Sequence, residues 1–327
     1  MNGLLETLNK HKARLLALPG CTGVAIGYKE VAGEVIDRLA IVVFVERKQK
    51  GIAADCLVPA ILDGIPTDVV EKTFGYKLTA TDPFARFTQM FSGISITPLG
   101  NPDGWGTLGC IIHTTGNAHV PGGNYLLTNQ HVLSKADPNQ PGNRSTVVLQ
   151  PGSADKPPAD YACGDYVYGV EDDINDCAIA TIGRGRTWRN EVPNHPWRPG
   201  RRTLAGVAAA AVGDEVYKYG ATTNSTRGVV RFVHADYPDI RIRDAIYIES
   251  LDGSMWVGTG DSGSILIRYS DDFVLGLNCA ADHATELPAN SHPPLHDRMP
   301  AYSAGYAYDI QRQMNVFGGV VTLAPNP

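Results

Sequence analysis

The chain has 327 residues, of which 43% are hydrophobic and 19% charged, and its formal net charge is −6 from 28 basic and 34 acidic residues. This composition is typical of a globular protein with a sizeable core, and the acidic balance argues against nucleic acid as a general partner, since phosphate binding needs a basic face. The longest apolar run, 204–212, is far shorter than the roughly 20 residues of a membrane span, so no membrane segment is expected.

Residues 1–80 predict a small α+β module. Apolar side chains recur on one helical face from Leu4 to Ala17, and Pro19-Gly20 ends that helix. Strands are expected at 22–28, 39–45 and 65–70, the last toward a sheet edge because Pro66 lacks an N–H group. The module is either a packing appendage or a regulatory domain that docks a partner, and the sequence leaves both roles open.

From residue 92 onward, short strands alternate with Gly, Pro and Asn turns. The 35 glycines and 22 prolines of the chain suit an all-β architecture. A first set of strands is expected at 93–97, 109–113, 125–128, 146–150, 165–170 and 177–182. A stretch rich in Pro and Trp, 184–203, reads as a linker. A second set is expected at 215–219, 228–233, 240–242, 245–249, 264–268 and 274–280, followed by a helix over 304–314.

The segment Gly260-Asp261-Ser262-Gly263 carries the strongest chemical signal. Glycines on both sides of a serine allow a tight turn that exposes the hydroxyl and points backbone N–H groups into the same space. A nucleophile beside converging N–H donors is what acyl transfer requires. The same four residues also occur in ordinary loops, so the motif needs support from elsewhere in the chain.

Two upstream segments provide that support. An apolar strand runs into His131 in Leu127-Thr128-Asn129-Gln130-His131, and Asp176 opens an apolar run in Asp176-Cys177-Ala178-Ile179. With Ser262 third in order, the chain here resembles the chymotrypsin-like (trypsin-like) serine peptidases, whose corresponding segments typically read Leu-Thr-Ala-Ala-His and Asp-Ile-Ala-Leu. The Thr-rich segment 218–230 also looks like bacterial members of that family. The resemblance covers roughly residues 92–320.

The resemblance implies a mostly β fold with two six-stranded antiparallel β-barrels behind the N-terminal α+β module. Residues 92–183 would form the first barrel with the histidine and the aspartate, and 184–203 the linker. Residues 204–327 would form the second barrel with the serine and a C-terminal helix.

The resemblance also implies a catalytic triad of Ser262, His131 and Asp176. Ser262 would attack the substrate, His131 would serve as base and then acid, and Asp176 would orient the imidazole. The N–H groups of Gly260 and Ser262 would form the oxyanion hole.

Three further aspartates lie near these motifs. Asp172 and Asp173 are interpreted as a solvated turn, since only Asp176 leads directly into the apolar run. The family's counterpart of Asp261 pairs with a new N-terminus in relatives made as zymogens. No activation site is recognisable near Ile94, so we expect Asp261 to satisfy local hydrogen bonds in an ordered loop.

By resemblance, Gly276, Leu277 and Asn278 would flank the substrate, and the residues before the nucleophile, with Met255 and Trp256, would form the base of the specificity pocket. Trypsin-type preference for Arg or Lys needs an acid there, and the nearest one is Asp252. We therefore expect an apolar or small side chain on the acyl side of the scissile bond.

The expected function is a serine endopeptidase acting on protein or peptide substrates through an acyl-enzyme. The alternatives are a catalytically silent or latent peptidase-fold protein that binds peptides or needs a partner for activation, and an esterase-type acyl hydrolase. A regulatory partner would act through residues 1–80.

No nucleotide fingerprint or Cys-x-x-Cys pair is present, so no cofactor is expected. A group of acids and histidines is interpreted as a flexible loop rather than a metal site; its members are Asp282, His283, Glu286, His292, His296 and Asp297.

The chain contains six cysteines. Secreted relatives often form a disulfide from the residue after the catalytic histidine, but Val132 stands there. Free thiols and a cytoplasmic location are therefore expected, in agreement with the absence of an apolar signal segment at residues 1–20.

Overall fold

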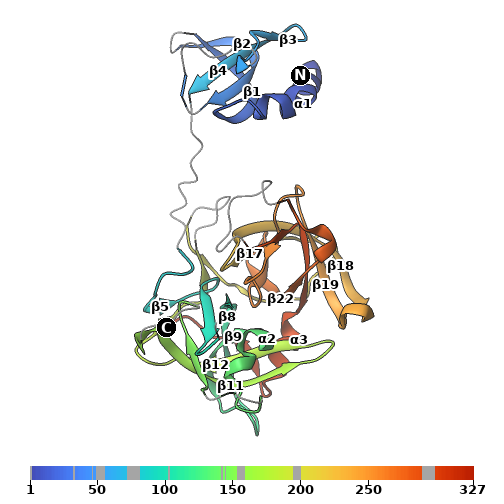
Figure 1. Cartoon of the computed structure of the whole chain (residues 1–327). Coiled ribbons are helices and arrows are strands. Elements are labelled where there is room, and N and C mark those ends of the chain that lie inside the picture. The colour runs from blue at the N-terminus through green and yellow to red at the C-terminus, as the bar shows by residue number, and fades with distance from the viewer. Residues whose placement is uncertain are drawn as a thin grey trace. The chain divides into compact units, whose positions relative to one another are not determined.

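The computed structural model describes residues 2–31, 34–45, 47–48, 56–71, 82–101, 104–140, 143, 145–152, 159–193, 200–288 and 299–327. The chain divides into two compact units, Met1–Lys77 and Leu78–Pro327. Figure 1 shows both units with their helices and strands labelled.

The N-terminal unit consists of helix α1 (Asn2–Leu16) and a four-stranded sheet in the order β1-β2-β4-β3. The strands are β1 (Cys21–Val31), β2 (Glu34–Val45), β3 (Ile61–Leu62) and β4 (Ile65–Glu71). The helix contributes Leu15 to a small hydrophobic core, in which this side chain packs with Ile41, Val43 and Leu62. The expected edge position of this strand is wrong: β4 lies between β2 and β3, and Pro66 itself is paired with Ile61 of the short strand β3.

The first sheet of the larger unit has the order β25-β8-β9-β12-β11-β10-β6-β7. Its strands are β6 (Ser95–Pro98), β7 (Gly106–Thr107), β8 (Cys110–Thr114), β9 (Gly123–Thr128), β10 (Val147–Leu149), β11 (Ala162–Glu171), β12 (Asp176–Thr181) and β25 (Val321–Leu323). Leu108 N donates to Ile94 O at 2.9 Å, which brings the start of β8 back beside β6 and curls the sheet into a barrel. Helix α2 (Gln130–Leu133) follows β9 directly.

The second sheet closes on itself, because β22 pairs with β24 as well as with β21. The ring comprises β17 (Glu215–Gly220), β18 (Asn224–Tyr237), β19 (Ile242–Ser250), β21 (Ile265–Arg268), β22 (Phe273–Ala281) and β24 (Ala304–Asp309). Short elements complete the unit: β5 (Gln89–Met90), β13 (Thr187–Trp188), β14 (Glu191–Val192), β15 (Arg202–Thr203), β16 (Gly206–Val207), β20 (Val257–Gly258), β23 (Ala301–Tyr302) and helix α3 (Ile310–Asn315).

The predicted fold class is confirmed: the protein is mostly β, and its larger unit contains two barrels of largely antiparallel strands (Figure 1). One buried hydrophobic cluster contains Leu127 and Cys177 from the first barrel together with Tyr217, Ile265 and Leu277 from the second. The barrels therefore pack against each other through a shared core. None of the helices in the described part of the chain combines the length and apolar character that a bilayer crossing requires.

The predicted helix over 304–314 is wrong in its first half. Residues 304–309 form β24, which pairs with β19 on one side and β22 on the other. Alternating small and tyrosine side chains suit a strand buried between two neighbours. The helix starts only after Asp309, whose Oδ1 accepts from Arg312 N at 2.9 Å as an N-cap.

Candidate active site

The structure brings His131 and Asp176 together, although 44 residues separate them in the chain. His131 lies in α2 at the end of β9, and Asp176 begins β12, which pairs with β9. His131 Nδ1 lies 2.6 Å from Asp176 Oδ2, and His131 N donates to Oδ1 at 3.1 Å. An ionised carboxylate only accepts hydrogen bonds, so Nδ1 carries the proton and Nε2 is left as an acceptor.

The surroundings tune the basicity of His131. Burial lowers the pKa of His131, but the charge and hydrogen bond of Asp176 and the charge of Glu171 together outweigh it, so the pKa lies above its ordinary value. The Asp176 side chain is only 8% exposed, whereas His131 keeps 37% of its surface accessible. A buried acid orienting a partly open imidazole is the arrangement that general base catalysis needs.

The two competing aspartates take no part in this pair. Asp172 accepts from the N–H groups of Ile174 and Asn175, both at 2.8 Å, within the turn before Asp176. Asp173 forms an ion pair with Arg241 at 3.1 Å. Their interpretation as turn residues agrees with these contacts.

The Ser262 loop contacts the strand that leads into His131. Thr107 N donates to Ser262 O at 2.8 Å, and Thr128 Oγ1 donates to Thr107 O at 2.8 Å. A Cβ on Gly263 would lie 2.1 Å from Thr128 Oγ1, so only glycine allows this approach. Ser262 therefore lies at the seam between the barrels, on the side of His131.

The predicted oxyanion donors, the N–H groups of Gly260 and Ser262, belong to the Ser262 turn. Gly260 has a φ of 98°, a conformation that favours glycine, and its carbonyl accepts from Thr107 Oγ1 at 2.9 Å. Asp261 N and Gly263 N are bonded to Gly258 O and Asn278 O. The N–H groups of Gly260 and Ser262 have no acceptor among the described residues.

Asp261 is anchored by a contact that the sequence did not reveal. Its Oδ2 lies 2.6 Å from Lys218 Nζ, and both side chains are completely buried. The carboxylate also accepts from Thr222 N, from Thr223 N and Oγ1, and from Gly258 N. The expectation of local hydrogen bonds agrees with these contacts, but the buried cation is an addition.

No hydrogen bond joins the Ser262 hydroxyl to His131 in the described part of the structure. Within the described residues, the Ser262 hydroxyl has no hydrogen-bond partner. Such contacts are often long in ligand-free sites and shorten when substrate binds.

The predicted substrate-binding residues are 276–278, which lie in β22, and Met255 and Trp256, which precede β20. Leu277 faces the core shared by the barrels, and 276–278 of β22 are hydrogen bonded on both edges. Among the described residues, 279–281 pair with β24 alone, which leaves their other edge available. Trp256 is fully buried in the core of the second barrel, whereas Met255 is half-buried.

A pocket of about 520 Å³ adjoins Asp176 and the start of this open edge. Its walls include Glu171, Asp172, Arg241 and the pair Cys279-Ala280. Burial and the nearby Asp176 charge raise the pKa of Glu171. The pocket carries an excess of carboxylates next to the candidate catalytic pair.

No group of three or more metal-ligating side chains occurs among the residues that the structure describes. Of the acid and histidine group noted in the sequence, His292, His296 and Asp297 lie outside the described residues.

No family model matches the chain. The protein NARROW LEAF 1 of Oryza sativa subsp. japonica is 28% identical over 297 residues, which cover 76% of this chain and 48% of that protein. The chain thus spans about half the length of this relative. Among solved structures, Nocardiopsis protease (NAPase) is 16% identical at a TM-score of 0.47, covering 72% of this chain and 98% of that one. Cellulomonas bogoriensis chymotrypsin is 16% identical at a TM-score of 0.46, covering 73% of this chain and 100% of that one.

Proposed function

We propose that this protein is a serine endopeptidase that cleaves peptide bonds through Ser262, His131 and Asp176. The observation that carries the proposal is the 2.6 Å contact between His131 Nδ1 and Asp176 Oδ2, in a structure whose serine turn has two N–H groups without an acceptor among the described residues. These are the base, its orienting acid and the oxyanion donors that acyl transfer requires.

In this mechanism, His131 Nε2 takes the Ser262 proton as Oγ attacks the substrate carbonyl carbon. The N–H groups of Gly260 and Ser262 stabilise the resulting oxyanion, and Asp176 stabilises the imidazolium. The C–N bond then breaks and His131 returns the proton to the leaving amine. Water, activated by the same imidazole, attacks the acyl-enzyme and releases the acid and Ser262.

The substrate backbone would pair with the open edge of β22 at 279–281. An extended peptide that adds to a free strand edge gains main-chain hydrogen bonds. The same edge leads to the pocket beside Asp176, which would receive a side chain on the acyl side of the scissile bond.

A second candidate function is a latent or peptide-binding protein with the same fold. The specific observation in its favour is the Ser262 hydroxyl, which has no hydrogen-bond partner among the described residues. In that case a bound partner, acting through the N-terminal unit, would bring serine and histidine into contact.

Labelling by a fluorophosphonate probe tests the proposal. The wild type should be labelled, and Ser262→Ala should not. Ser264→Ala is the matched control, since this serine lies two residues further along and its buried hydroxyl has no hydrogen-bond partner in the part of the chain that the structure describes. Labelled Ser264→Ala with unlabelled Ser262→Ala supports an activated Ser262, whereas a folded wild type that resists labelling contradicts the peptidase. A panel of peptide and ester substrates then separates a peptidase from an esterase.

A further inference from the structure

We propose that Gln313 of helix α3 is a positioning residue that holds Asp176 in register with His131, an inference that rests on the proposed function. The Gln313 side chain is completely buried, and it is the point where α3 meets the segment leading into Asp176.

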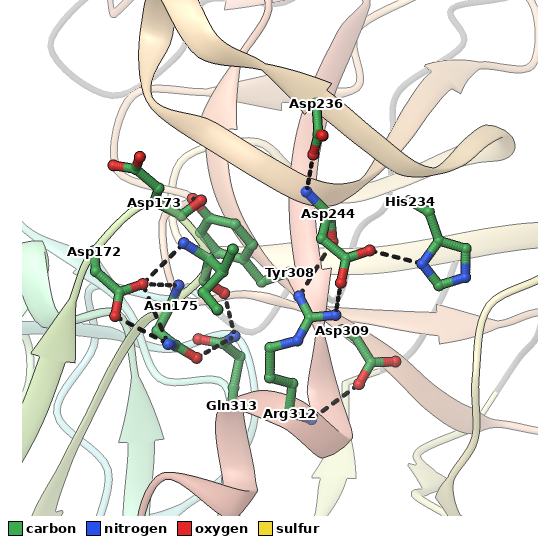
Figure 2. A network of polar contacts seen from close by, with 11 residues as sticks. Asp172, Asp173, Asn175, His234, Asp236, Asp244, Tyr308, Asp309, Arg312 and Gln313 are labelled. Carbon is green, nitrogen blue, oxygen red and sulfur yellow. Dashed lines mark hydrogen bonds and ion pairs between the residues drawn. The ribbon is translucent and has the colours of Figure 1, made fainter.

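The Gln313 amide holds the main chain on both sides of Asn175. Its Oε1 accepts from Asp176 N at 2.9 Å, and its Nε2 donates to Ile174 O at 3.1 Å. Figure 2 shows the same amide pointing toward Asn175, whose Oδ1 lies 3.4 Å from Nε2. The Gln313 side chain therefore forms hydrogen bonds to three consecutive residues of the loop, Ile174, Asn175 and Asp176.

Every polar group of Asp176 has a hydrogen-bond partner. The carboxylate bonds to His131, and the carbonyl accepts from Asn129 Nδ2 at 2.7 Å. Only the N–H group is held from outside the first barrel, by Gln313. Without it the Ile174–Asp176 segment keeps its bonds to Asp172 but loses its attachment to α3, so the Asp176 carboxylate can shift relative to His131. A displacement of about 1 Å in such a group can cost about 100-fold in rate.

Helix α3 is itself fixed to the second barrel. Arg312 Nη1 donates to Asp244 O at 3.2 Å, and its guanidinium forms an ion pair with the Asp244 carboxylate in β19 (Figure 2). The start of the same loop is also held from the second barrel, because Arg243 N donates to Asp173 O at 2.7 Å. The barrel that carries Ser262 therefore helps to fix the position of Asp176.

The test compares Gln313→Met with Gln311→Met in the full chain. Methionine keeps the length of glutamine but cannot form hydrogen bonds, and Gln311 is an exposed residue of the same helix. We expect kcat of Gln313→Met to fall about 10- to 100-fold with KM within about twofold of wild type, and Gln311→Met to match wild type. The pKa of His131, followed by NMR, should fall in Gln313→Met alone, since Asp176 and Glu171 are the charged groups that face it. A folded Gln313→Met with wild-type kcat and wild-type His131 pKa overturns the inference.

Gln313→Glu provides a second variant in case the methionine protein does not fold. Its carboxyl oxygen still accepts from Asp176 N, so the His131 pKa should stay at or above the wild-type value, and a lower one overturns the inference. The NMR readout does not depend on turnover. If the wild type resists fluorophosphonate but the His131 pKa still falls in Gln313→Met, the proposed function fails while the positioning role of Gln313 stands.

Discussion

Replacing Lys218 by methionine should destabilise the protein and slow the labelling of Ser262. Lys218 and Asp261 are both completely buried, and their charged atoms lie 2.6 Å apart. Burial lowers the pKa of Lys218, and the neighbouring Asp261 offsets part of that effect. The substitution leaves the Asp261 carboxylate without a counter-charge and also removes the bond from Lys218 Nζ to Thr223 Oγ1.

Removing one partner of a buried ion pair typically costs about 3–5 kcal/mol in unfolding free energy. At about 2–4 °C per kcal/mol for a unit of this size, the melting temperature should fall by about 6–20 °C. Asp261 lies between the two N–H donors of Gly260 and Ser262. A displaced turn should therefore slow the labelling of Ser262 by at most about 1,000-fold, since losing one oxyanion donor typically costs about 100- to 1,000-fold in rate.

Thermal unfolding and the rate of fluorophosphonate labelling measure the two effects. Lys135→Met is the control, because Lys135 is exposed on the same unit and should change stability by no more than about 0.5 kcal/mol. The double variant Lys218→Met/Asp261→Asn should recover part of the loss, since it removes the unpaired charge. A Lys218→Met protein with unfolding free energy within about 1 kcal/mol of wild type and an unchanged labelling rate would refute this account of the turn.

Two further predictions concern the base and the turn. Because His131 must be neutral to accept a proton and its pKa is raised, kcat/KM should rise with pH and reach half its maximum above about pH 6.5. Asp176→Asn should lower that midpoint and reduce kcat by about 10⁴-fold, whereas an unchanged pH profile would exclude Asp176 as the partner of His131. Gly260→Ala should slow labelling at least about 100-fold, because its Cβ would lie 2.4 Å from Trp105 Nε1. Gly253→Ala, also at positive φ but with open space around its Cβ, should label at the wild-type rate, and equal loss in both variants would rule out the steric explanation.

Local sequence sufficed for much of the fold. Apolar runs bounded by Gly, Pro and Asn predicted most strands of both barrels, and the residues around His131 and Asp176 predicted a pair that the structure brings into contact. The segment 304–309 was misassigned because alanine and tyrosine do not by themselves distinguish a buried strand from a helix. Its strand conformation is decided by the two neighbours, β19 and β22, between which it pairs.

The supporting residues of the site were not predictable in the same way. Lys218 lies in a strand that reads as half-exposed, and nothing near it in sequence signals a buried partner 43 residues away. Gln313 is one of several polar residues in a short helix, and its contact with Asp176 spans 137 residues. The first contact depends on how β17 packs against the Ser262 turn and the second on how α3 packs against the first barrel, and periodicity and motifs encode neither.

Strand β25 ties a late part of the chain to the first barrel, with a consequence for the order of events during synthesis. Residues 321–323 cover the edge of β8, and Asn190 Nδ2 donates to Ala324 O at 2.8 Å. An uncovered strand edge invites pairing with other chains. The half of the molecule that carries His131 leaves the ribosome well before Ser262, yet its sheet stays incomplete until residues 321–323 emerge. The nascent chain therefore cannot cover this edge of β8 with β25 until the second barrel has been translated.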